Sequence, residues 1–109
     1  MLAIAPPVWA HAFLDKATPA VGSTLRDPPT QVSLRFSERL EPAFSKLQVL
    51  DARGRRVDKD DASVSSDDAS VLSVSVRALP PGRYTVKWRV LSVDTHVTEG
   101  DFTFDVGGR

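Results

Sequence analysis

The chain contains two histidines and no cysteine, so few of its residues could hold a metal ion. His96 lies two positions after Asp94, within the segment Ser92–His96. In an extended segment, residues two apart point to the same side, so this imidazole and this carboxylate could face one ligand. The same spacing also fits a structural hydrogen bond between Asp94 and His96 with no metal involved.

The second histidine, His11, could supply two further nitrogen ligands. It follows Met1–Ala10, an uncharged segment whose end resembles the cleavage region of a secretory signal peptide. If cleavage follows Ala10, His11 becomes the first residue, and its free α-amine and its imidazole can bind one ion together. An uncleaved N-terminal extension is the alternative, and His11 then offers the imidazole alone.

An amine, two imidazoles and a carboxylate make a ligand set rich in nitrogen and oxygen. Tetragonal coordination by such ligands favours Cu(II) or Ni(II), and Cu(II) heads the Irving–Williams order. The α-amine has an ordinary pKa of about 7.7–8.0, so binding displaces a proton and should weaken in acid. The soft ligands that Cu(I) prefers are missing, because Met1 is the only methionine. If these residues bind a metal, we predict one Cu(II) ion and no Cu(I) site.

The elements that would position these ligands are strands. Apolar and polar residues alternate in short segments separated by turn residues, and no segment has a sustained helical period. The predicted strands are Val32–Phe36, Leu47–Val49, Leu72–Val76, Tyr84–Val90 and Phe102–Val106. We predict an all-β fold, an immunoglobulin-like or cupredoxin-like Greek-key β-sandwich or barrel of about seven strands. Trp88 is the expected core anchor of the strongest strand, which directly precedes Asp94 and His96.

Two stretches between strands carry no predicted ligand. Asp51–Gly54 is typical of a hairpin turn, with Gly54 able to adopt a positive φ. Residues 58–70 are rich in Asp and Ser, and we interpret them as a solvated loop or a weak edge strand.

Composition limits the class of protein. A length of 109 residues favours one compact domain. The formal net charge is zero, from 14 basic and 14 acidic residues, which argues against a nucleic-acid partner. The lack of cysteine excludes disulfides and a thiolate nucleophile. We divide the chain into a signal-peptide remnant (1–10), a β-sandwich domain that would hold the metal site (11–107) and a frayed C-terminus (108–109).

Several motifs occur in the order found in the CopC family of periplasmic copper-binding proteins, which the chain from His11 onward resembles. The motifs are His11–Leu14, Thr18–Ala20, Val32–Glu38, Gly82–Arg89, Ser92–His96 and Phe102–Phe104. The specific part of the resemblance is the N-terminal His together with the Ser-x-Asp-x-His pattern, since the strand motifs alone fit many sandwiches.

The resemblance implies an exported periplasmic protein, not an enzyme, that carries, buffers or donates copper in homeostasis or resistance. It implies His11, Asp94 and His96 as Cu(II) ligands. Glu38 matches a family carboxylate and is expected to be an outer or occasional ligand, or else a surface charge. Arg89 also matches a family position and is expected to pair with a carboxylate. We expect a monomer whose partners are the copper ion and an inner-membrane copper transporter of the CopD type.

Two other functions fit part of the pattern. In a metal-free immunoglobulin-like interaction module, Asp94 and His96 would only satisfy a loop. Copper monooxygenases that act on polysaccharides also use an N-terminal His with a second His. They need a larger flat substrate face than this domain offers, and an equatorial carboxylate would stabilise Cu(II) against reduction. We therefore favour the copper carrier.

Overall fold

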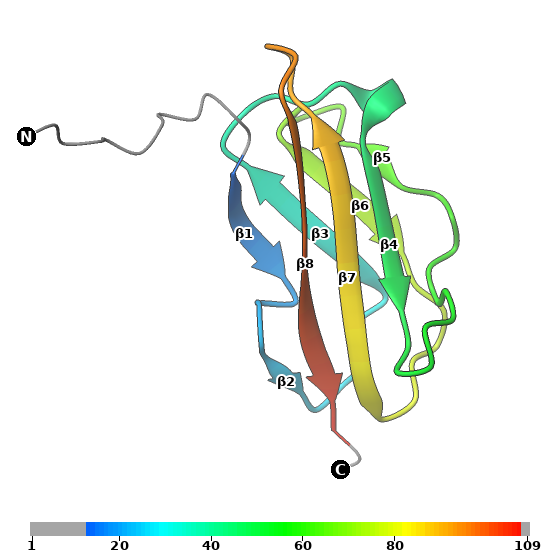
Figure 1. Cartoon of the computed structure of the whole chain (residues 1–109). Helices are drawn as coiled ribbons and strands as arrows, with labels where there is room; N and C mark the ends of the chain where they lie inside the picture. The colour runs from blue at the N-terminus through cyan, green and yellow to red at the C-terminus, as the bar shows by residue number, and fades with distance from the viewer. Residues whose placement is uncertain (1–12, 108–109) are drawn as a thin grey trace, which may run out of the picture.

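Alternation of apolar and polar residues produces two sheets in the computed structural model, which describes residues 13–107. One sheet has the strand order β1-β3-β6-β5 and the other β2-β8-β7-β4, as Figure 1 shows. The elements are β1 (Leu14–Thr18), β2 (Thr24–Leu25), β3 (Gln31–Phe36), the 3-10 turn η1 (Pro42–Phe44), β4 (Lys46–Leu50), β5 (Ser63–Val64), β6 (Val71–Ser75), β7 (Gly82–Leu91) and β8 (Val97–Val106).

The predicted all-β sandwich is confirmed. The two sheets remain separate, so the barrel form of the prediction is not observed. Residues 13–107 form eight strands, where about seven were predicted. Two of the eight are very short: β2 pairs with the end of β8, and β5 is a two-residue edge strand within the stretch 58–70. Between residues 13 and 107, no helix combines the length and the apolarity needed to cross a membrane.

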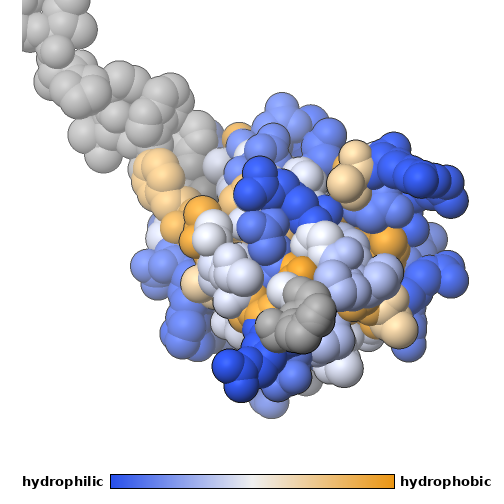
Figure 2. All heavy atoms as spheres, turned by 90° about the horizontal axis from the view of Figure 1, so that it is seen from below, coloured by the Kyte–Doolittle hydropathy of each residue, from blue (hydrophilic) through white to orange (hydrophobic). Residues whose placement is uncertain are grey.

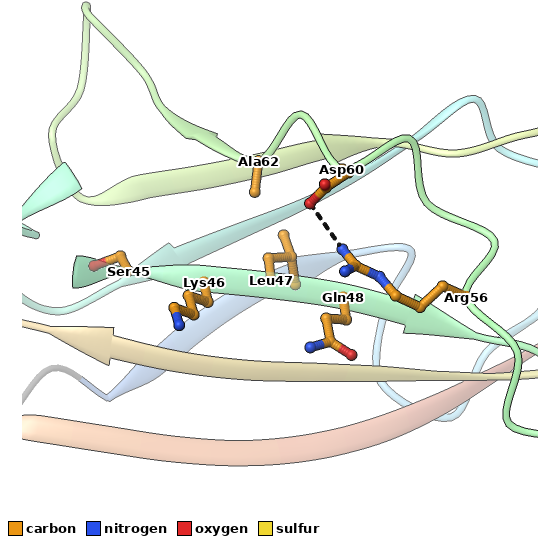
Figure 3. Close-up of a pocket in the computed structure, with 7 residues that line it drawn as sticks. All are labelled: Ser45, Lys46, Leu47, Gln48, Arg56, Asp60 and Ala62. Carbon is orange, nitrogen blue, oxygen red and sulfur yellow. Dashed lines mark hydrogen bonds and ion pairs between the residues drawn. The ribbon is translucent and has the colours of Figure 1, made fainter. Parts of the chain in front are cut away.

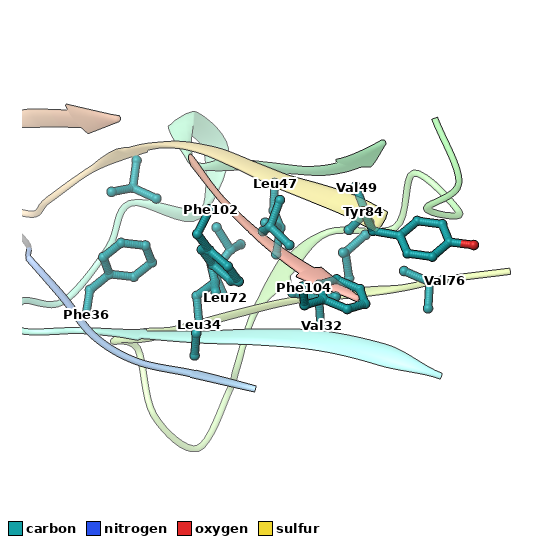
Figure 4. Close-up of a cluster of buried hydrophobic side chains, with 14 of the residues drawn as sticks. Val32, Leu34, Phe36, Leu47, Val49, Leu72, Val76, Tyr84, Phe102 and Phe104 are labelled. Atoms are coloured by element: carbon teal, nitrogen blue, oxygen red, sulfur yellow. The ribbon is translucent and has the colours of Figure 1, made fainter. Parts of the chain in front are cut away.

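The core lies between the sheets. It is built from every second residue along the strands, whose side chains face the other sheet. Leu34 of β3 and Phe102 of β8 belong to one cluster, and Figure 4 shows the side chains that surround them. The rings of Tyr84 and Phe104 stack with centroids 5.6 Å apart. A slip of one residue would turn these side chains toward solvent, so burial fixes the register of the strands.

The hairpin of β7 and β8 is the longest unit of the fold, with paired residues from Gly82 and Val106 to Leu91 and Val97. β8 starts five residues before the predicted segment, because Gly100 interrupts the apolar pattern. A Cβ at Gly100 would lie 2.6 Å from Cζ2 of Trp88, so only glycine lets the indole pack over this strand. Asp94 and His96 therefore lie in the hairpin loop between two long strands.

One end of the sandwich collects the loop and the start of the described chain. In Figure 1 the beginning of β1, the end of β3 and the β7–β8 loop lie at this end. Ser37 donates its N–H to the carbonyl of Phe13, and the N–H of Phe13 donates to the hydroxyl of Ser37, both at 2.8 Å. Val93 donates its N–H to the carbonyl of Arg39 at 2.9 Å. We call this end of the molecule the loop end.

A buried carboxylate lies beside β4, at the outer edge of its sheet. The side chain of Asp58 has no exposed surface, and its oxygens accept hydrogen bonds from the N–H of Val49 (2.8 Å), the N–H of Asp60 (3.0 Å) and the guanidinium of Arg56 (2.6 Å). Burial alone would raise the pKa of Asp58, but these hydrogen bonds and the charge of Arg56 together lower it. The stretch predicted as solvated thus begins with a structural residue.

Candidate metal centre

The loop from Ser92 to His96 reverses the chain between β7 and β8. The N–H of Ser92 donates to the carbonyl of His96 at 3.0 Å, and the N–H of Thr95 donates to the carbonyl of Ser92 at 2.9 Å. Thr95 has a φ of 74°, in the left-handed region that a β-branched residue rarely adopts. This strained position lies between the two predicted ligands, and such positions are often found at functional sites.

The loop brings Asp94 and His96 together. Nδ1 of His96 lies 3.3 Å from Oδ1 of Asp94, and the two side chains are 46% and 38% exposed. The pair meets through a tight turn and not through the extended geometry that the spacing suggested. Both side chains remain accessible to an ion from solvent.

Ser92 holds this pair in place through hydrogen bonds from the buried side of the loop. It is completely buried, and its hydroxyl donates a hydrogen bond to Oδ1 of Asp94. The same hydroxyl accepts the N–H of His96 at 3.4 Å. The hydrogen bond from Ser92 is the main cause that lowers the pKa of Asp94, with a smaller contribution from His96. The carboxylate is therefore ionised at neutral pH, as a metal ligand must be.

The role of Ser92 was not predicted from the sequence. The sequence feature that could have identified it is its position two residues before Asp94, within the Ser-x-Asp-x-His motif. Ser92 also forms an isolated antiparallel bridge with Leu40, a residue far away in the sequence.

The other two predicted ligands, Glu38 and His11, have different outcomes. Glu38 is half-buried after the end of β3. Within residues 13–107, no group of three or more His, Cys, Asp or Glu side chains could hold a metal ion, so Glu38 is not grouped with Asp94 and His96. His11 lies outside the described residues, as do the predicted segments 1–10 and 108–109. The described residues thus supply one imidazole and one carboxylate.

Two neighbours of the site were predicted from their positions on β7. Trp88 was expected to anchor the core; it is partly buried and packs against the core, with ring centroids 6.0 and 6.1 Å from those of Phe36 and Phe102. Arg89 was expected to pair with a carboxylate. No ion pair of Arg89 occurs in the part of the chain that the structure describes, and its side chain is exposed.

The candidate ligands do not line a deep cavity. The hollow in Figure 3 lies between the edge of β4 and the segment 56–62, where Arg56 and Asp60 form an ion pair at 3.2 Å. Leu47 and Ala62 form part of its wall, and neither Asp94 nor His96 does. The candidate ligands therefore lie on an exposed loop of a rigid sandwich, an arrangement common for binding residues.

Comparison with known proteins gives consistent matches over the whole described domain. The model of the CopC domain matches residues 14–107. The chain is 36% identical to Protein YobA of Escherichia coli K12 over 104 residues, which covers 94% of this chain and 84% of that protein. It is 30% identical to Copper resistance protein C of Escherichia coli over 113 residues, covering 97% and 89%. It is 32% identical to Copper transport protein CutJ of Bacillus subtilis over 100 residues, covering 91% of this chain and 18% of that protein.

Solved structures give the same result. CopC from Methylosinus trichosporium OB3b superimposes with a TM-score of 0.83 at 37% identity, covering 89% of this chain and 94% of that one. PcoC from Escherichia coli, a methionine-rich copper resistance protein, superimposes with a TM-score of 0.78 at 31% identity, covering 89% and 99%. The present chain differs in having a single methionine.

Proposed function

Because the chain belongs to the CopC family, whose members are copper resistance and copper transport proteins and not enzymes, we propose that it carries Cu(II) outside the cytoplasm. The mature protein begins at His11 and binds one ion through the α-amine and imidazole of His11, the carboxylate of Asp94 and the imidazole of His96. Glu38 is an outer or occasional ligand. The observation that carries this proposal is the 3.3 Å approach of His96 to an ionised Asp94 on an exposed loop.

The position of Phe13 supports the participation of His11. Phe13 is tied to Ser37 at the loop end by two hydrogen bonds. Two residues of chain span at most about 7 Å, which is the reach that the proposed participation of His11 requires from Phe13.

The types of ligand atom support Cu(II) as the cargo. Imidazole, amine and carboxylate suit tetragonal Cu(II), whereas Cu(I) prefers the thiolates and thioethers of Cys and Met. The chain has no Cys, and its one Met precedes the proposed mature start. A site for Cu(I) is therefore not part of the proposal.

The proposed partner is an inner-membrane copper transporter of the CopD type, which receives the ion from this protein in the periplasm. The relationship to CutJ supports transfer, because a copper transport protein contains a similar domain as 18% of its length. We propose that the present protein acts as a monomer and meets its acceptor as a separate molecule.

The test compares two forms of the protein. N-terminal mass analysis of the exported protein establishes whether it starts at His11. Calorimetric titration and electron paramagnetic resonance then measure Cu(II) binding by that form, by a form that keeps Met1–Ala10, and by His96→Ala. We expect one ion per chain, weaker binding by the longer form and a large loss in His96→Ala. Equal affinity of the wild type and His96→Ala would show the proposal to be wrong.

A further inference from the structure

The outer face of the β7–β8 hairpin changes in character toward the loop end. Three of its cross-strand pairs join opposite charges, and the pair that adjoins the Ser92–His96 loop joins two apolar residues. The pairs are Arg83 with Asp105, Lys87 with Asp101, Arg89 with Glu99, and finally Leu91 with Val97. Opposite charges stabilise such pairs on a solvated face. The apolar pair is therefore an exception, and it lies next to the candidate metal ligands.

A shallow hollow of about 330 Å³ lies over this apolar pair. It is lined by Ala43, Phe44, Lys46, Arg89, Leu91 and Val97, which together we call the Phe44 surface. Phe44 is 64% exposed and Val97 is 45% exposed. The surface is continuous from η1 across β7 to the first residue of β8.

Hydrogen bonds hold the Phe44 surface in place before any partner binds. The hydroxyl of Ser45 accepts the N–H of Leu91 at 3.3 Å and donates to the carbonyl of Glu41 at 2.9 Å. The N–H of Glu41 donates to the carbonyl of Leu91 at 2.8 Å. The turn that presents Phe44 is thus fixed against β7, which reduces the entropic cost of binding a partner.

Two cations border the hollow, and Glu99 of β8 lies opposite one of them, Arg89. Lys46 and Arg89 lie opposite each other on β4 and β7, and both are exposed. Neither forms an ion pair with any residue between 13 and 107. Like charges in opposed positions repel each other, so a carboxylate supplied from outside would be attracted to both.

We propose that the Phe44 surface docks the protein that exchanges copper with this chain, through a segment in which an apolar side chain adjoins a carboxylate. This inference rests on the proposed function and names the chemistry of its partner. Val97 directly follows His96, so a segment docked there lies beside the metal-binding loop. Docking would hold the acceptor next to the ion during transfer.

A peptide segment fits this surface better than an anionic membrane does. The hollow suits a single side chain, and Glu41 and Glu99 beside it would repel the many charges of a broad anionic surface more than one carboxylate. Figure 2 views the opposite end of the sandwich, where apolar residues show in small separate areas among hydrophilic ones. Val21, which is 61% exposed on the β1–β2 connection, provides a matched apolar control away from the loop.

The docking test uses a synthetic peptide of the sequence Gly-Gly-His-Gly-Ser-Gly-Leu-Glu-Phe-Glu and the metal-free, isotope-labelled protein. We expect chemical-shift changes at the Phe44 surface on titration with the peptide. Phe44→Ser should weaken binding on the order of tenfold, Arg89→Gln should weaken it about threefold, and Val21→Ser should leave it unchanged. A peptide with Gln in place of both Glu residues should bind more weakly than the original.

The transfer test uses the copper-loaded protein. The Gly-Gly-His end of the peptide takes up Cu(II) and gives an absorbance band of its own. Transfer to the full peptide should be faster than to Gly-Gly-His alone in the wild type and in Val21→Ser, but not in Phe44→Ser. Failure of the protein to bind Cu(II) would refute the proposed function and leave the docking measurement interpretable. Absent or misplaced shifts at millimolar peptide, binding to phosphatidylglycerol vesicles in place of the peptide, or self-association through this surface would overturn the docking proposal.

Discussion

The buried hydroxyl of Ser92 donates a hydrogen bond to the carboxylate of Asp94 from beneath the loop that ends at His96. The carboxylate is thereby oriented and kept ionised from the side opposite to solvent. Groups that orient metal ligands in this way affect affinity although they do not touch the ion.

Replacement of Ser92 by Ala should therefore weaken Cu(II) binding about tenfold or more while both ligands remain. Competitive titration against a chelator of known affinity measures the change. Ser73→Ala is the matched control, because it removes the 3.0 Å hydroxyl contact with Ser33 within the other sheet. The same loss of affinity in both variants would contradict an orienting role for Ser92.

Binding of Cu(II) should stabilise the form that starts at His11. An ion present at a hundredfold excess over its Kd adds about 2.7 kcal/mol, which for a domain of this size raises Tm by roughly 10 °C. Thermal unfolding followed by circular dichroism, with and without Cu(II), gives the shift, and a chelator should reverse it. An unchanged Tm would favour a structural hydrogen bond between Asp94 and His96 over a metal site.

Gly100→Ala should destabilise the fold by about 1–3 kcal/mol, because the new methyl group would overlap the indole of Trp88. The clash is with the ring atoms Cζ2 and Cη2, at 2.6 and 2.8 Å from the ideal Cβ position. Urea unfolding measures the free-energy change, and Trp fluorescence reports the displaced ring. Gly107→Ala is the control, since its Cβ would find its nearest neighbour at 3.5 Å. Similar losses in the two variants would disprove the steric explanation.

Asp58 should make part of the stability depend on pH. Its pKa in the folded protein is lowered, so the stability it contributes is present above the unfolded pKa of about 3.9 and is lost as the pH falls through the folded value. Asp58→Asn should cost about 1–3 kcal/mol at pH 7, because the charge-assisted hydrogen bonds from Arg56 are lost. Urea unfolding at pH 7 and at acidic pH should show the two proteins converging in acid. The exposed Asp67→Asn should follow the wild type at every pH, and a gap for Asp58→Asn that persists in acid would argue against this assignment.

The fold was accessible from the sequence because burial imposes a period of two residues, which Tyr84–Val90 displays clearly. The first half of β8 lacked that signal, since Gly100 has no side chain and its neighbours face solvent. The buried role of Asp58 was hidden because it depends on Val49, a partner on another strand. Local patterns identify strands, whereas contacts between distant segments decide which polar residues are buried.

Asp94 and His96 lie together as their spacing suggested, but the backbone geometry that brings them together is different. Spacing and family resemblance both singled out Asp94 and His96, and the two side chains do lie together. Their approach depends on a turn with Thr95 at a positive φ, which the sequence does not indicate for a threonine. His11 remains a prediction, because it lies outside the described residues.

The reciprocal hydrogen bonds between Phe13 and Ser37 have a consequence for how affinity could be tuned. They fix the point at which the N-terminal ligand of the proposed site is anchored, so its effective concentration depends on the length of chain between His11 and Phe13. Insertion of a few glycines after His11 would dilute this ligand around Asp94 and His96 without altering any donor atom. The length of one short tether would then set how readily the ion is released.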